Sequence, residues 1–483
     1  MQTGYTAMTT FLHRARRALV GDRAFYRAVL AIILPVIVQN SITNFVNFLD
    51  NLMVGALGDA EMSGVSVANQ LVFVFNLTLF GGLSGPAIFG AQFYGAEDIE
   101  GLRNTFRIKL WESILLVGTA LAAFSLWGEE LISLFLQGEG DPALAEAILG
   151  HGQRYLILLL PGLPAFALSV CYAGTLREMG ETRLPMAASV AAVATNALFN
   201  WLLIFGRLGF PALGVTGAAM ATVLSRYVEL GIVAGFTHLR RRRYTFIQGV
   251  YRTLRVPGSL LRRVLRLGAP LLANELLWSV GMSTLTAAYS LCGLAVVAAL
   301  SISSTISNLF NAVTFAMGTA VSVVVGQSLG AGRFAEARRD AWRLMAFSVA
   351  AAVGMGVLLA AASPWIPLVY RAVTPEVRSL ATRLLLIFAC VMPLGAFANC
   401  AYFTLRSGGK TLITFIFDSG YMWAVAVPLA YLLVRGLGWP IEPTFATVEG
   451  ANLLKCILGF LFVRSGRWVH NLARETGPRE KQL

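Results

Sequence analysis

The sequence predicts an all-α integral membrane protein with twelve transmembrane helices in two similar halves. Its composition, its spacing of apolar runs and an internal repeat carry this prediction. Hydrophobic residues make up 57% of the 483 residues and charged residues only 13%, whereas a soluble domain has roughly 25% charged residues. A soluble fold of this length could not bury so much apolar surface. The composition therefore indicates a membrane protein.

Apolar stretches long enough to cross about 30 Å of hydrocarbon occur twelve times. We predict helices at 28–52, 63–91, 107–136, 151–176, 184–205, 213–238, 265–290, 296–326, 338–370, 379–405, 411–435 and 444–463. This spacing predicts a cytoplasmic arm (1–27), a six-helix N-lobe (28–238), a basic connector (239–264), a six-helix C-lobe (265–463) and a cytoplasmic tail (464–483).

The basic residues predict the orientation of these helices. Of the 38 lysines and arginines, 30 fall in the N-terminal arm, every second connection and the C-terminal tail, and five in the remaining connections. Because positive charge collects on the cytoplasmic side of a membrane, we expect a multi-pass protein of the inner cell membrane with both termini in the cytoplasm. The net charge of +13 is thus a topology signal, and we expect no nucleic-acid partner.

The two halves of the chain share residues at a constant offset. Gln92 matches Gln327 and Gly95 matches Gly330, each 235 residues further on. Six helices per half leave both halves in the same orientation, so we expect a pseudo-two-fold axis along the membrane normal. Two such lobes would pack around a central cavity.

Polar residues within the first apolar run predict a site in the N-lobe. Asp50 lies on this run, and an ionisable group inside a spanning helix is a functional candidate. Asn40, Asn44 and Asn47 precede it at helical spacing, which gives a polar stripe that we expect to line the substrate cavity. The alternative for these amides is hydrogen bonding between neighbouring helices.

The fifth apolar run adds Asn196 and Asn200, one turn apart. Together with Asp50 they offer the carboxylate and amide oxygens that suit Na⁺. The same carboxylate could instead carry a proton, and the sequence leaves these two coupling ions open.

The second half carries its own acids, Glu275 and Asp418, which we also predict to take part in cation coupling. Their repeat partners, Asn40 and Ser189, are uncharged, so the halves do not share their charges. The alternative for Glu275 is neutralisation of Lys455, a lysine within the last apolar run.

The sequence does not favour an enzyme. The four histidines lie outside or at the ends of the apolar runs, and neither an HExxH nor a GxSxG element occurs. The five cysteines lie in or beside apolar segments and form no CxxC pair. We therefore expect no catalytic residues and no cofactor.

Several motifs resemble the multidrug and toxic compound extrusion (MATE) family. They are Phe48–Gly55 with Leu57-Gly58, Gly214–Thr222, the paired Leu-Arg-x-x-Gly motifs at Leu176 and Leu405, and Asn274–Trp278. The resemblance spans nearly the whole chain. It implies two six-helix bundles arranged as an inverted V, and it assigns the first lobe's cation site to Asp50, Asn196 and Asn200. It also implicates Glu275 in the second lobe, whereas no acid stands at the family's usual helix 10 place, near Gly395 and Ala396.

This resemblance implies export of amphipathic, often cationic, drugs or metabolites in exchange for Na⁺ or H⁺, by a monomer in the lipid bilayer. The alternative is a lipid or oligosaccharide-lipid flippase of the same superfamily. Because the charges deep in the apolar runs are mainly acidic, they favour cationic cargo.

Overall fold

The computed structural model describes residues 19–136, 141–370 and 373–474, and within these ranges it contains helices and no strands. The chain forms two compact units. Unit 1 comprises residues 1–37, 91–98 and 269–483, and unit 2 comprises residues 38–90 and 99–268. The basic connector thus belongs to unit 2, and both units take segments from the first half of the sequence.

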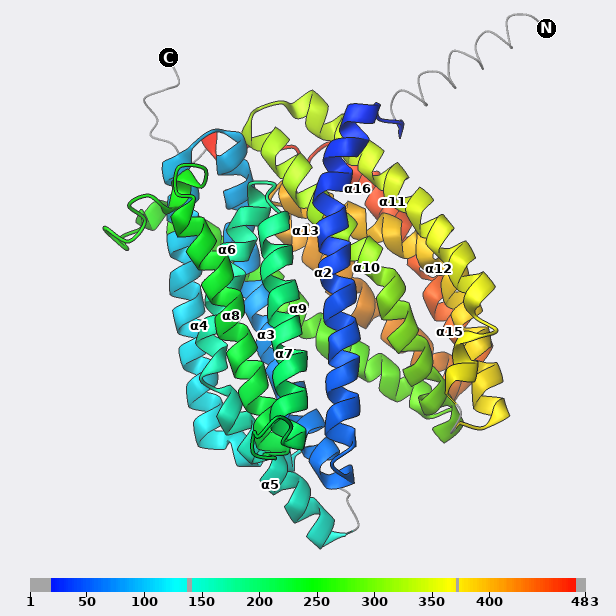
Figure 1. Cartoon of the computed structure of the whole chain (residues 1–483). Helices are drawn as coiled ribbons and strands as arrows, with labels where there is room; N and C mark the ends of the chain where they lie inside the picture. Colours follow the sequence, from blue (N-terminus) through cyan, green and yellow to red (C-terminus); the bar gives the residue numbers. More distant parts are fainter. Residues whose placement is uncertain (1–18, 137–140, 371–372, 475–483) are drawn as a thin grey trace, which may run out of the picture. The chain divides into compact units, whose positions relative to one another are not determined.

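The helices of the first half are α2 (Arg23–Gly55), α3 (Asp59–Gly95), α4 (Ile99–Ser133), α5 (Pro142–Leu159), α6 (Gly162–Glu178), α7 (Arg183–Phe205), α8 (Val215–Leu239) and the 3₁₀ turn η1 (Thr245–Ile247) (Figure 1). The second half has α9 (Gly258–Ser290), α10 (Leu294–Gly330), α11 (Phe334–Ala362), η2 (Ile366–Val369), α12 (Pro375–Ser407), α13 (Thr411–Phe415), α14 (Val427–Tyr431), α15 (Ile441–Gly450) and α16 (Asn452–Ser465). Two stretches of π-helix lie between α13 and α14, η3 (Ile416–Gly420) and η4 (Met422–Ala426), and a third, η5 (Leu432–Gly436), follows α14.

The predicted all-helical membrane fold is confirmed. In the described ranges, ten helices are long and apolar enough to cross a membrane, or eleven if the bent pair α5 and α6 is one span. The remaining predicted span, 265–290, lies in α9, whose 33 residues could reach about 50 Å. Its arginines near the start and its polar residues further on keep its mean hydropathy low.

Two predicted spans differ from the structure because of proline. The helix predicted at 151–176 is broken between α5 and α6 at Pro161, where the chain bends by 51°. The helix predicted at 338–370 is too long, since α11 ends at Ala362 just before Pro364, and η2 follows. Proline lacks the N–H that a continuing helix needs.

Close backbone approach holds the helices of unit 2 together. Helix α8 packs against α7 and α6, and α6 packs against α4 (Figure 1). A Cβ at Gly217 would lie 2.6 Å from the carbonyl oxygen of Leu203, and one at Gly85 would lie 2.8 Å from the Cα of Gly268. Small residues at such crossings let membrane helices associate without a hydrophobic driving force.

In unit 1 the repeated residues at the ends of α3 and α10 meet each other. A Cβ at Gly95 would lie 2.0 Å from the carbonyl oxygen of Gln327, and one at Gly330 would lie 1.8 Å from that of Gln92. The Gln92 side chain donates to the Ser407 carbonyl at 2.8 Å. Glycine is therefore required at both places, and the pairing accounts for two of the repeat matches.

Gly330→Ala should destabilise the protein by about 1–3 kcal/mol, because the added methyl group forces the two helix ends apart. The control is Gly354→Ala in the middle of α11, where nothing lies within 4 Å of the new Cβ. That change should be neutral or slightly stabilising, since alanine is the better helix former. Thermal unfolding in detergent measures both effects. Equal transition temperatures for the two variants would contradict the prediction that close contact at Gly330 stabilises the protein.

Candidate functional site

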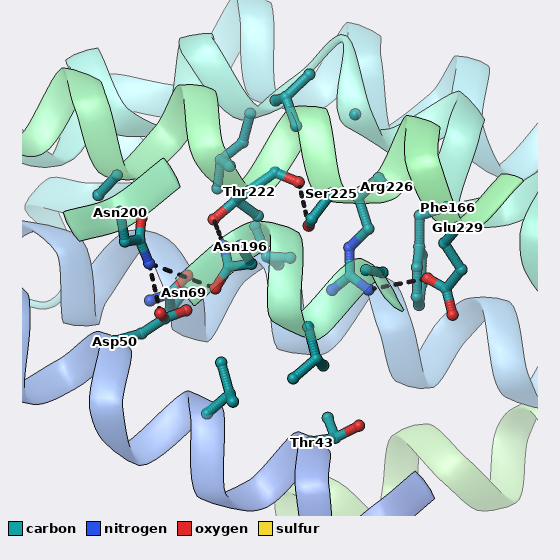
Figure 2. A pocket seen from close by; sticks show the side chains of 18 of the residues that line it. Thr43, Asp50, Asn69, Phe166, Asn196, Asn200, Thr222, Ser225, Arg226 and Glu229 are labelled. Atoms are coloured by element: carbon teal, nitrogen blue, oxygen red, sulfur yellow. Dashed lines mark hydrogen bonds and ion pairs between the residues drawn. The ribbon is translucent and has the colours of Figure 1, made fainter. Parts of the chain in front are cut away.

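A polar cavity of about 360 Å³ lies among the helices of unit 2. Helices α2, α3, α5, α6, α7 and α8 all contribute to its wall (Figure 2). The polar side chains that line it are Thr43, Asp50, Asn69, Asn76, Tyr155, Ser189, Asn196, Asn200, Thr222, Ser225, Arg226 and Glu229. The predicted residues Asp50, Asn196 and Asn200 are thus brought together at one site.

Asp50 is held by two amides from α7. The Nδ2 of Asn200 donates to Oδ1 of Asp50 (Figure 2). The amide of Asn196 turns its nitrogen toward Asp50: it donates to both carboxylate oxygens at 2.9 Å, and its oxygen accepts from the Thr222 hydroxyl at 3.2 Å.

The oxygens around Asp50 suit a hard cation. Oδ1 of Asn200 is buried and has no hydrogen-bond partner in the described ranges, and such an atom in a folded protein calls for a ligand. Together with the two carboxylate oxygens of Asp50 and the hydroxyl of Thr222 it supplies oxygen atoms, the ligand type that Na⁺ prefers, while both amides direct a nitrogen at the carboxylate itself. No cluster of three His, Cys, Asp or Glu side chains that could hold a metal occurs among the described residues.

The cavity's other charges balance each other. Nη1 of Arg226 lies 3.5 Å from Oε2 of Glu229 on the next turn of α8. Its guanidinium also lies over the ring of Phe166, 4.5 Å from the centroid (Figure 2). Asp50, in contrast, has no ion pair within the described part of the chain. It is therefore the acid of this cavity that is available to a mobile cation.

Asn40 and Asn44 of the predicted asparagine stripe do not line this cavity. Helix α2 contributes Thr43, Val46, Asp50 and Val54 instead, while Asn40 and Asn44 are half-buried. The side chain of Asn47 lies outside the described part of the structure. A role of these three amides in a substrate cavity stays a prediction.

Sequence reasoning missed the contribution of α8. Thr222, Ser225, Arg226 and Glu229 all line the cavity, and they recur at the spacing of three and four residues that places side chains on one helix face. The same periodicity was the signal used for the first and fifth apolar runs. Applied to 213–238, it would have indicated this wall. Tyr155 on α5, whose hydroxyl bonds to Thr222, carries no comparable signal.

Unit 1 contains a second polar cluster around Asn274 and Asp418. Nδ2 of Asn274 donates to Oδ2 of Asp418 at 3.1 Å, and its Oδ1 accepts from the Ser419 hydroxyl at 2.7 Å. Asp418 and Ser419 lie in the π-helix η3, and such bulges are frequent at functional sites. The wider turn lets two consecutive side chains reach the same residue of α9.

Lys455 pairs with Asp418, and the alternative that it neutralises Glu275 is wrong. Its Nζ bonds to Oδ1 of Asp418 and lies 5.3 Å from the ring centroid of Phe417 and 5.7 Å from that of Tyr421. Glu275 is half-buried and forms no hydrogen bond or ion pair within the described ranges. The roles of Glu275 and Asp418 in cation coupling stay predictions.

The sequence profile described as MatE matches residues 35–202 and 270–432, which is more than half of the chain. The chain belongs to the MatE family. A similar protein of this family is the "Probable multidrug resistance protein NorM" of Thermotoga maritima, 25% identical over 95% of this chain and 96% of the relative. The protein of the same name from Mesorhizobium japonicum is 30% identical over 86% of this chain and 88% of the relative.

Solved structures agree with the fold. An outward-facing multidrug resistance MATE transporter of the MOP superfamily superposes with a TM-score of 0.82, over 93% of this chain and 96% of the other, at 21% identity. The MatE resemblance seen in the motifs is confirmed. This MatE chain is a multi-pass membrane transporter rather than an enzyme.

The contact between Lys455 and Asp418 predicts a coupled stability effect. Lys455→Met and Asp418→Asn should each destabilise the protein, by on the order of 1–3 kcal/mol, because each leaves a half-buried polar partner uncompensated. The double variant should lose less than the sum of the two. Thermal unfolding of the four proteins in detergent gives the coupling energy, and strictly additive losses would show that the pair contributes nothing to stability.

Proposed function

We propose that this MatE-family protein is an antiporter that exports amphipathic, often cationic, drugs or metabolites in exchange for Na⁺ or H⁺. The observation that carries the proposal is the arrangement at Asp50: within the described part of the chain this acid has no ion pair, and a buried amide oxygen of Asn200 beside it has no hydrogen-bond donor. The names of the relatives, which include multidrug resistance proteins, support the choice of cargo.

In the proposed cycle the cation binds at Asp50. When the site holds no cation, the Asn196 amide nitrogen donates to both carboxylate oxygens. Na⁺ or a proton that neutralises the carboxylate competes with these hydrogen bonds, so the amide donors and the ion alternate as partners of Asp50.

In this cycle, electrostatic attraction to the ionised acid links binding of the cargo to binding of the ion. A cationic compound and the coupling ion both favour an ionised acid nearby, and the two therefore disfavour each other's binding. Asn40, Asn44 and Asn47 are our candidates for polar contacts with the cargo. Alternating access of the two species across the bilayer then couples ion entry to export.

We further propose that the protein works as a monomer in the inner cell membrane with both termini in the cytoplasm. The distribution of basic residues supports this orientation.

Asp50→Asn should abolish ion-driven export and leave folding intact, because the amide keeps the shape of the carboxylate but cannot take up a cation. The measurement is counterflow of a fluorescent cation in proteoliposomes under separate Na⁺ and H⁺ gradients. Glu130→Gln is a matched control, since it removes one acid from the exposed end of α4. Wild-type export by Asp50→Asn would refute the role given to this acid.

Binding competition tests the same site without transport. Raising Na⁺ or lowering pH should weaken binding of a fluorescent cation to purified protein, and the drug should weaken the ion by the same factor. The coupling expected for linked sites is about 5–150-fold in affinity. Asp50→Asn should flatten this dependence while retaining the apolar part of drug binding. Affinity that is indifferent to both ions would argue against antiport and favour the flippase.

Glu275→Gln tests, in the same assay, whether an acid of unit 1 contributes to ion coupling in addition to Asp50 of unit 2. If Glu275 also carries a coupling ion, its variant should change the ion dependence of transport while the Asp50 site still responds.

A further inference from the structure

The segment after α8, residues 246–254, is held in a fixed conformation on the surface of unit 2. Three donors at four-residue intervals on α4 hold three of its carbonyl oxygens at the same interval. Nε of Arg103 donates to Phe246 at 3.2 Å, Nε of Arg107 to Val250 at 3.0 Å and Nε1 of Trp111 to Leu254 at 3.1 Å. The backbone of residues 246–254 is therefore fixed along one face of α4.

Apolar side chains anchor the segment further. Phe246 and Val250 are fully buried, and Ile247 is 4% exposed. The ring of Phe246 packs on Phe106 of α4 with 5.3 Å between centroids. Since its apolar side faces the protein, the polar side of the segment is presented outward in a defined conformation.

A hollow on this polar side is lined by cations and by no acid. Its wall consists of His238, Arg241, Arg242, Ile247, Gln248, Gly249, Val250, Tyr251 and Arg252. Nε2 of Gln248 donates to the Arg241 carbonyl at 2.7 Å. This hydrogen bond joins the two stretches of chain that form the wall. Three arginines thus line one depression.

These arginines differ from their neighbours in having no counter-ion. Arg243 pairs with Glu181 at 2.7 Å, and Arg107 pairs with Glu100 at 3.0 Å. Arg241, Arg242 and Arg252 form no ion pair in the described ranges. Guanidinium groups bind phosphate oxygens with paired hydrogen bonds, so the missing counter-ion points to a phosphate-bearing anion.

The surroundings of the hollow favour a lipid as the source of that phosphate. Leu239 is 79% exposed and Tyr251 49% exposed, next to the cationic wall. On α4, Trp111 is exposed, and the following Ile114 and Leu115 are exposed apolar side chains of a membrane-spanning helix. Exposed tryptophan and tyrosine mark the level of lipid headgroups, and acyl chains would cover the leucines and isoleucine beyond.

We infer that the hollow formed by Arg241, Arg242 and Arg252 binds the phosphate headgroup of an anionic phospholipid from the surrounding leaflet. Basic pockets at the cytoplasmic ends of membrane helices are suited to such headgroups. The inference does not depend on the coupling ion or on the cargo, so the antiport proposal can fail while this one stands.

The test is lipid binding to the purified full-length protein. Detergent-solubilised protein is titrated with short-chain phosphatidylglycerol, with phosphatidylcholine and with inorganic phosphate, and binding is followed by native mass spectrometry. We expect saturable binding of phosphatidylglycerol, weak binding of phosphatidylcholine, and weak competition by inorganic phosphate. The double variant Arg241→Gln/Arg252→Gln should lower the affinity for phosphatidylglycerol about tenfold or more.

A charge-matched double variant distinguishes a site from general attraction. Arg240 and Arg243 belong to the same run of four arginines and do not line the hollow. Arg240→Gln/Arg243→Gln removes the same charge and should change the affinity much less. Equal losses in the two double variants would overturn the inference. Inorganic phosphate that binds as tightly as the lipid would overturn the lipid assignment, and unchanged thermal unfolding in both variants confirms that they fold.

Discussion

The contact on which the rest of the fold depends is the crossing of α3 and α10, where each backbone touches the other without intervening side chains. Gly95 meets the carbonyl of Gln327, and Gly330 meets the carbonyl of Gln92. Because the two glycines occupy equivalent places in the repeat, the same short motif supplies both halves of the contact. Oε1 of Gln92 also accepts from the backbone N–H of Leu472 at 2.7 Å, so the last described residues are fixed to the same point. The end of α3 is thereby part of unit 1, although most of the helix belongs to unit 2.

Three helices pass from one unit to the other, and each contains proline close to the boundary. The boundaries fall after residue 37 in α2, after residue 90 in α3 and after residue 268 in α9. Pro35, Pro86 and Pro270 lie within five residues of them. Proline removes a backbone hydrogen bond and weakens the helix there, so these are the positions at which the helices bend at least cost. Under the proposed function, alternating access needs such places, and here proline supplies them close to each boundary.

The helices and the grouping of Asn196 and Asn200 with Asp50 could be predicted from the sequence, because both depend on short-range pattern. The cation-coupling role of these residues stays a prediction. Length and hydropathy determine a membrane span, and helical spacing together with the family motif brought Asn196 and Asn200 to Asp50. The partner of Lys455 could not be predicted in this way. Asp418 and Glu275 both lie within apolar runs, and the choice between them depends on how each helix is rotated. The π-helix at Ile416–Gly420 changes that rotation, since each extra residue turns the following side chains by about 100°. No residue pattern in the sequence predicted this π-helix.

The two acidic sites show how a repeated scaffold can support unequal chemistry. In unit 2 the carboxylate of Asp50 is surrounded by neutral amides, one of which keeps an unpaired buried oxygen. In unit 1 the carboxylate of Asp418 already has an ammonium group, that of Lys455, supplied by the chain itself. A covalently attached cation cannot leave, whereas a bound ion can, so under the proposed function the same attraction gives stability at Asp418 and ion exchange at Asp50. The repeat partner of Asp50 is Leu285, so the repeat keeps the scaffold at this position without keeping the charge. Under the proposed function, Asp418 is the acid least able to exchange an ion, because its cation is part of the chain, whereas Asp50 and Glu275 form no ion pair in the described ranges.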